Sequence, residues 1–150
     1  MQYWLMKSEP DEFSFADLER KGREPWTGVR NYQARNYMRT AQVGDIVLFY
    51  HSNCNEPGIA GLAKVSQVAF PDPTQFDAKS DYFDAKAERT QPRWFCIEVS
   101  FYKKFKKHVS LDQLRAERAL QTMPIMRAGN RLSVTPVTAT EFKMIQKLGS

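Results

Sequence analysis

The alternation of apolar and polar positions marks out several short strands along the chain. The clearest runs are rich in aromatic and β-branched residues, which favour extended structure. These runs cover residues 2–6, 45–51, 59–69 and 94–102, and a short edge strand is expected at 132–134, before Pro136. Their spacing is irregular, which is not typical of the strand–helix alternation of a parallel sheet.

Three helix starts share one local signal. In each, a Ser or Thr is followed three residues later by an acid or an amide, and apolar residues flank the pair. This pattern is a capping box with a hydrophobic staple, in which side chains satisfy the first free backbone N–H groups of a helix. The helices are predicted at 14–21, 110–117 and 138–148.

Residues 70–93 carry three prolines and are predicted to form an ordered, partly helical excursion. Its aromatic residues Phe76, Tyr82 and Phe83 are expected to pack against other parts of the chain. Short strands in the middle of the chain and helices near both ends favour an α+β fold. We therefore predict a single domain over residues 1–150, built as a small mixed β-barrel with flanking helices.

Composition narrows the possible functions. A chain of 150 residues can bury a core without a disulfide or a metal. Cys54 and Cys96 are the only cysteines and lack the spacing of a zinc site, so we expect no metal, no cofactor and a reducing setting such as cytosol or nucleus. No apolar stretch approaches the roughly 18 residues of a membrane span, so a membrane partner is not expected.

The charge balance is basic, with a net charge of +5. Basic side chains gather in residues 20–39 and again in 103–107. Each cluster alone could be an ordinary solvated face, but two in one small domain favour an anionic partner such as nucleic acid. The candidate phosphate-binding residues are Lys7, Arg35, Arg39, Lys103, Lys104, Lys106 and Lys107.

Residues 24–39 interleave aromatic, amide and arginine side chains. Trp26 and Tyr32 offer flat surfaces on which a base could stack, and Arg30 and Asn31 could bind a phosphate or a base edge. Such a mixture is typical of single-strand or flipped-base recognition. The alternative is that the aromatic residues belong to the core and the arginines to an exposed helix face.

Two strand ends add polar groups. Lys7 and Ser8 end the first strand, and His51 and Ser52 end the strongest one. A nucleophilic Cys54 activated by His51 is disfavoured, because no orienting partner or oxyanion signature accompanies the pair. The sequence thus predicts a binding protein rather than an enzyme.

Several blocks, in order along nearly the whole chain, resemble the EVE-domain family, which includes the thymocyte nuclear protein group. The blocks are Tyr3–Pro10, Trp26–Asn36, Gly44–Asp45, Phe49–Asn53, Pro57–Gly61, Pro71–Asp77, Pro92–Trp94 and Arg131–Val134. The resemblance implies a PUA-like fold related to YTH domains, and binding of nucleic acid through a base pocket. Carried over onto this sequence, it points to Ser8, Trp26, Arg30, Asn31, Tyr32, His51 and Ser52.

The favoured interpretation is a reader of a flipped, modified base, with modified cytosine in DNA as the leading candidate. Two alternatives stay open. One is an RNA-binding PUA-like module that acts on tRNA or rRNA, and the other is a sensor of a nucleoside-like small molecule.

Overall fold

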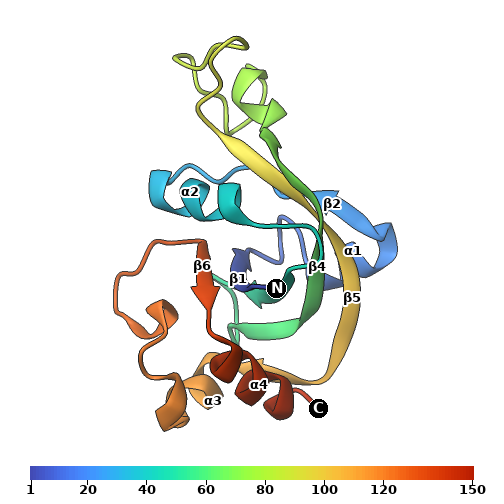
Figure 1. Cartoon of the computed structure of the whole chain (residues 1–150), viewed down its shortest axis with the longest axis vertical. Coiled ribbons are helices and arrows are strands. Elements are labelled where there is room, and N and C mark those ends of the chain that lie inside the picture. Colours follow the sequence, from blue (N-terminus) through green and yellow to red (C-terminus); the bar gives the residue numbers. More distant parts are fainter.

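The computed structural model describes all of residues 1–150 and shows one mixed six-stranded sheet (Figure 1). Its strand order is β2-β5-β4-β3-β1-β6, with β1 and β3 parallel and every other pair antiparallel. The strands are β1 (Tyr3–Ser8), β2 (Arg23–Pro25), β3 (Ile46–His51), β4 (Gly58–Pro71), β5 (Phe95–Ser110) and β6 (Val134–Val137).

Four α-helices flank the sheet. They are α1 (Phe15–Lys21), α2 (Tyr32–Thr40), α3 (Leu111–Ala116) and α4 (Ala139–Leu148). The three helices predicted from capping boxes are confirmed, and Ser14, Ser110 and Thr138 each form both hydrogen bonds of the box. Helix α2 was not among the predicted helices, because Asn31 caps it without a capping-box partner three residues later.

The core lies on both faces of the sheet. Along β1, Trp4 and Met6 belong to a cluster that includes residues of α1 and α2, whereas Leu5 belongs to a second cluster with α3 and α4. Successive strand residues point to opposite faces, so β1 is covered on both sides. The sheet is therefore a rigid central layer whose strand ends can hold a site.

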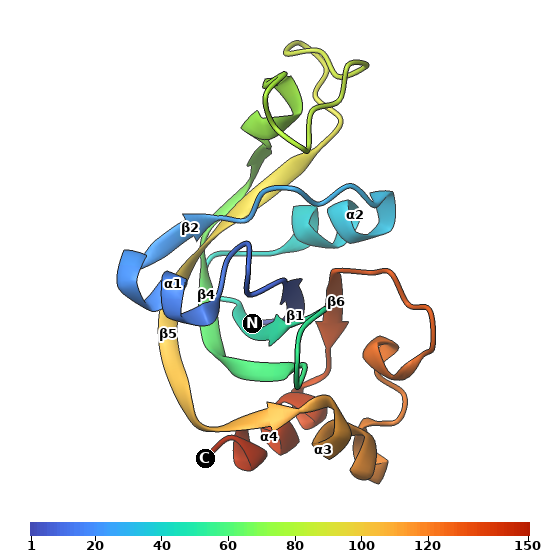
Figure 2. The ribbon, with the colours of Figure 1, turned by 180° about the vertical axis from the view of Figure 1, so that it is seen from behind.

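An excursion between β4 and β5 projects beyond the sheet at the end away from α3 and α4 (Figures 1 and 2). It contains a 3₁₀ turn (Pro73–Phe76), in agreement with the predicted partly helical character. Buried Gln75 ties it together: its amide nitrogen donates to the carbonyls of Asp72 and Trp94, and its oxygen accepts from the N–H groups of Arg93 and Trp94. Two further 3₁₀ turns follow α3, at Arg118–Leu120 and Pro124–Met126.

Two strand predictions need correction. Strand β5 continues eight residues past the predicted end at 102, because Phe105 and Val109 are buried and keep it paired with β4 through the lysine run. The last strand lies at 134–137 rather than 132–134 and contains Pro136, which is tolerated because β6 is an edge strand.

The α+β class is confirmed. The end strands β2 and β6 do not pair with each other, so the sheet has two edges in its hydrogen bonding. The barrel itself stays a prediction.

Candidate nucleic-acid interface

The parallel pairing of β1 with β3 brings two polar strand ends together. Ser8 lies opposite His51 in the register, and the next residue, Ser52, donates its N–H to the Ser8 carbonyl at 3.0 Å. Strand β3 is buried along most of its length, and β1 is buried at Trp4, Leu5 and Met6. The sheet thus fixes the positions of these side chains at one edge.

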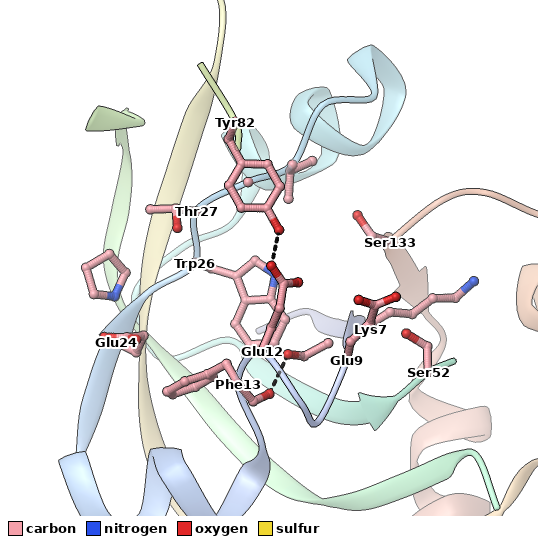
Figure 3. Close-up of a pocket in the computed structure, with 14 residues that line it drawn as sticks. Lys7, Glu9, Glu12, Phe13, Glu24, Trp26, Thr27, Ser52, Tyr82 and Ser133 are labelled. Atoms are coloured by element: carbon pink, nitrogen blue, oxygen red, sulfur yellow. Dashed lines mark hydrogen bonds between the residues drawn. The ribbon is translucent and has the colours of Figure 1, made fainter. Parts of the chain in front are cut away.

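A cavity of about 390 Å³ opens beside these strand ends (Figure 3). This volume is within the range of small-molecule sites. Its walls come from the end of β1 and the loop after it, from the end of β2 and the segment between β2 and α2, and from Ser52, Tyr82 and Ser133. Of the predicted site residues, Lys7, Ser8, Trp26 and Ser52 line it.

Trp26 forms the inner aromatic wall. It is only 7% exposed, packs edge-on against Phe49 with ring centroids 5.2 Å apart, and donates its backbone N–H to Ile97. These contacts make it part of the core as well as of the cavity. A base that entered the cavity would therefore meet a ring that is held by core packing.

Tyr82 forms a second aromatic wall and was not among the predicted site residues. It comes from the excursion and packs on Gly28, where an added Cβ would lie 2.7 Å from the tyrosine ring. Gly28 also has a φ of +89°, a conformation that favours glycine. The one sequence signal for Tyr82 was that a large aromatic side chain in an irregular segment is expected to pack against another part of the chain.

Arg30 holds Tyr82 in place instead of lining the cavity. Its five N–H groups donate to the Tyr82 carbonyl twice, and to Val29, Asp72 and Thr74 once each, at 2.7–3.1 Å. Its guanidinium lies 5.5 Å from the Tyr82 ring centroid. Because every donor is used, Arg30 has none left for a base edge.

A hydrogen bond crosses the cavity in front of Trp26 (Figure 3). The Tyr82 hydroxyl donates to Oε1 of Glu12 at 2.6 Å, across 70 residues of sequence. This bond and partial burial raise the pKa of Tyr82 to about 12, so its hydroxyl remains a donor at neutral pH. Glu9 and Glu24 also line the cavity, which makes this part of a basic protein locally acidic.

Lys7 supplies the positive charge of the cavity. Its ammonium group has no hydrogen-bond or ion-pair partner in the chain, and burial lowers its pKa. In Figure 3 it extends past Ser52 and Ser133, away from the Tyr82–Glu12 pair. The Lys7 ammonium and the Tyr82–Glu12 pair thus lie on different sides of the cavity, with Glu9 drawn beside Lys7 (Figure 3).

Hydroxyl groups also line the cavity. The Ser8 hydroxyl is occupied, because it donates to the Phe13 carbonyl at 2.5 Å. The hydroxyls of Thr27, Ser52 and Ser133 form no hydrogen bond within the chain and line the cavity. They are the free donors and acceptors that a ligand could use.

Asn31 and Tyr32 lie outside the cavity. The Asn31 oxygen caps α2 by accepting from the N–H of Ala34 at 3.0 Å. Tyr32 is 52% exposed and stacks on Trp94 with ring centroids 4.8 Å apart, and the guanidinium of Arg35 lies 4.7 Å from the Tyr32 ring centroid and 6.0 Å from that of Trp94. Together they form an exposed aromatic and cationic surface on α2.

His51 also lies outside the cavity lining. Its Nε2 accepts the N–H of Phe15, the first residue of α1, at 3.0 Å. Burial, and to a smaller extent the charge of His108, lower the pKa of His51. The ring therefore acts as a neutral acceptor that joins β3 to α1.

The remaining predicted phosphate contacts fall into two places. Arg39 lies on α2, 4.5 Å from the ring centroid of Phe95. The lysines of β5 lie at the opposite end of the molecule, where the backbone of Lys106 contacts the residue after α4 (Figure 2). Three of them, Lys103, Lys104 and Lys106, line a separate cavity of about 170 Å³.

No group of three or more His, Cys, Asp or Glu side chains is arranged to hold a metal ion. None of the helices is both long and apolar enough to cross a membrane.

The fold and site define an α+β protein with a mixed sheet, flanking helices and a cavity at the ends of its parallel strands. The match to the EVE domain family covers residues 2–148, and the chain belongs to that family.

Two groups of relatives are similar to it over nearly the whole chain. Thymocyte nuclear protein 1 is 39% identical in rat and 38% in human, over 97% of this chain and 73% of each relative. A solved structure from Pseudomonas syringae is 49% identical, with a TM-score of 0.96 over 99% of each chain. The structure of human THYN1 in complex with DNA containing 5-methylcytosine is 37% identical, with a TM-score of 0.94 over 100% of this chain and 98% of that one.

Proposed function

We propose that this chain binds DNA and accepts an extruded base, preferably 5-methylcytosine, in the cavity between Trp26 and Tyr82. The main observation that supports this proposal is the cavity, which combines two aromatic walls, free hydroxyls and an unpaired ammonium at the ends of two strands. Support comes from human THYN1, whose similar fold is in complex with DNA containing 5-methylcytosine. The proposed action is binding without catalysis.

The energetics favour a stacked base. Extruding a base costs a few kcal/mol, and stacking on an aromatic ring returns about 1–3 kcal/mol per base. Trp26 and Tyr82 are held by the core and by Arg30 respectively, so little side-chain freedom is lost when a base enters. Stacking on the two rings should therefore offset part of the free-energy cost of extrusion, and the fixed positions of the rings keep the entropy loss on binding small.

The polarity of the cavity sets the orientation of the nucleotide. A phosphate carries negative charge and should lie toward Lys7, whose ammonium is free. The base should lie toward Trp26, Tyr82 and Glu12 on the other side. Arg35 and Arg39 on α2 provide cationic groups for neighbouring phosphates.

Affinity for short oligonucleotides tests the proposal. Fluorescence anisotropy would compare single-stranded and duplex DNA, each with cytosine or 5-methylcytosine at one position, against RNA of the same sequence, at 50 and 200 mM salt. We expect affinity to fall steeply with salt, because phosphate contacts release counterions. We also expect the methylated DNA to bind about fourfold more tightly, because one buried methyl group contributes about 0.8 kcal/mol.

Two outcomes would contradict the proposal. Tighter binding to RNA than to DNA, with no effect of methylation, would assign the cavity to an RNA-binding module. Binding of free nucleosides with a shallow salt dependence would assign it to a small-molecule sensor.

A further inference from the structure

The side chain of Glu12 forms one hydrogen bond within the protein, to Tyr82. It is exposed, forms no ion pair, and lies in the loop between β1 and α1. Its Oε1 accepts from the Tyr82 hydroxyl at 2.6 Å, and its Oε2 has no partner. The tyrosine therefore fixes the direction of a carboxylate that still has acceptor capacity.

A carboxylate at neutral pH only accepts hydrogen bonds. It pairs well with the exocyclic amino group of cytosine, a donor. The corresponding position of thymine carries a carbonyl oxygen, which is an acceptor, so a carboxylate there faces an oxygen without a proton between them. The two bases are otherwise alike in ring size, and thymine carries the same methyl group as 5-methylcytosine.

We propose that Glu12, held by Tyr82, is the specificity residue that accepts from the exocyclic amino group of the bound base and rejects thymine. This inference rests on the proposed function, because it requires a base in the cavity. It adds a second criterion to the apolar recognition of the methyl group. A protein that reads the methyl group alone would bind thymine and 5-methylcytosine equally well.

The other carboxylates of the cavity are less suited to this role. Oε1 of Glu9 accepts from the side-chain amide of Asn53 at 2.8 Å, and both oxygens of Glu24 accept from Lys21 at 3.2–3.3 Å. Only Glu12 is bonded to an aromatic wall of the cavity. That bond holds its carboxylate at the hydroxyl end of Tyr82, a ring on which we expect a base to stack (Figure 3).

The test uses single-stranded DNA oligonucleotides, in which no base pair has to be opened. They carry 5-methylcytosine, cytosine or thymine at one central position in an otherwise identical sequence. Fluorescence anisotropy would give the dissociation constants for the unchanged protein, for Glu12→Gln and for Glu19→Gln. Glu19 is an exposed acid on α1, so its variant controls for the loss of one negative charge.

We expect the unchanged protein and Glu19→Gln to prefer 5-methylcytosine over thymine by about tenfold, the effect of one good base-edge contact. In Glu12→Gln the ratio should fall to within about twofold of one, because an amide can donate to the thymine carbonyl. Thermal unfolding would show that the variant is folded. Glu12→Ala, which removes the carboxylate altogether, should lose the same preference.

Failure of the proposed role of Glu12 can be distinguished from failure of the proposed function. Equal binding of 5-methylcytosine and thymine by the unchanged protein, both tighter than cytosine, would overturn the role of Glu12 and leave the proposed function standing. A preference that survives in Glu12→Gln and Glu12→Ala would assign the discrimination to another group. An unchanged protein that distinguishes none of the three bases would overturn the proposed function as well.

Discussion

Single side chains in this protein hold positions that their residue types alone do not reveal. Arg30 is a typical phosphate or base ligand, yet four of its donors hold the excursion and the fifth bonds to the carbonyl of Val29. Asn31 is typical of base-edge contacts, yet its oxygen caps α2. Tyr82 has no motif around it and becomes a cavity wall only because Gly28 leaves room for its ring.

His51 should make stability depend on pH. Its pKa is lowered in the folded protein, so between that value and about 6.5 the unfolded chain binds the proton more readily. The free energy of unfolding is therefore expected to be highest above pH 6.5 and to fall as the pH decreases through this window. Urea unfolding at pH 7.5 and 5.5 would measure it, and His51→Gln should show a smaller decrease. A decrease of equal size in His51→Gln would mean that another group is responsible.

Lys7 should contribute a phosphate contact that depends on salt. Replacing it with Met keeps a long apolar side chain and removes the ammonium group. We expect weaker DNA binding, and a slope of log affinity against log salt that is smaller by about one, as for the loss of one phosphate contact. Lys143→Met on α4 is the matched control. Equal slopes in Lys7→Met and the unchanged protein would remove Lys7 from the interface.

At the scale of elements, the excursion is anchored by one buried carboxylate. Asp72 is fully buried and accepts from the N–H of Gly28 at 2.8 Å and from Arg30 at 3.1 Å. It therefore joins the excursion to the segment before α2. Gln75 closes the base of the excursion in the same way.

Asp72→Asn should loosen this element. The substitution removes the charge that pairs with Arg30 and places an amide donor among donors, which should cost about 1–3 kcal/mol of unfolding free energy. Hydrogen exchange in residues 72–94 should become faster. The surface substitution Asp112→Asn should change stability by less than about 0.5 kcal/mol. Comparable stability of the two variants in urea would show that Asp72 is not the anchor.

Local signals predict the elements well where the cause is local. Capping boxes identify three helices because Ser or Thr and its partner lie within one turn. Alternation identifies the central strands because they are half or fully buried. It misses the second half of β5, where lysines interrupt the apolar pattern while Phe105 and Val109 remain buried. It also misses α2, whose only start signal is Asn31.

The site is less predictable than the fold. Lys7, Ser8, Trp26 and Ser52 are placed at the cavity by short segments and by one parallel strand pair. Contacts between distant segments decide the rest. The bond between Glu12 and Tyr82 joins residues 70 apart, and no pattern in the sequence relates them.

At the scale of the whole molecule, charge is divided between two ends. The cavity and the cationic surface of α2 lie near the excursion, whereas the lysines of β5 lie beside α4 (Figures 1 and 2). The net charge of +5 attracts a polyanion to either end. Trp26 and Tyr82 line the larger cavity, near the excursion, so base preference and general affinity should come from different parts of the surface.

The most direct test of base recognition compares Tyr82→Ala with Tyr102→Ala. Both remove a partly exposed tyrosine, but Tyr102 lies on β5, over Lys64 and outside the cavity. The dissociation constants of duplex DNA with cytosine or 5-methylcytosine at one position would be measured by fluorescence anisotropy. We predict that Tyr82→Ala loses about 1–3 kcal/mol of binding free energy, together with the preference for the methylated base, and that Tyr102→Ala retains both. An unchanged methylcytosine preference in Tyr82→Ala would show that the base is not read in this cavity.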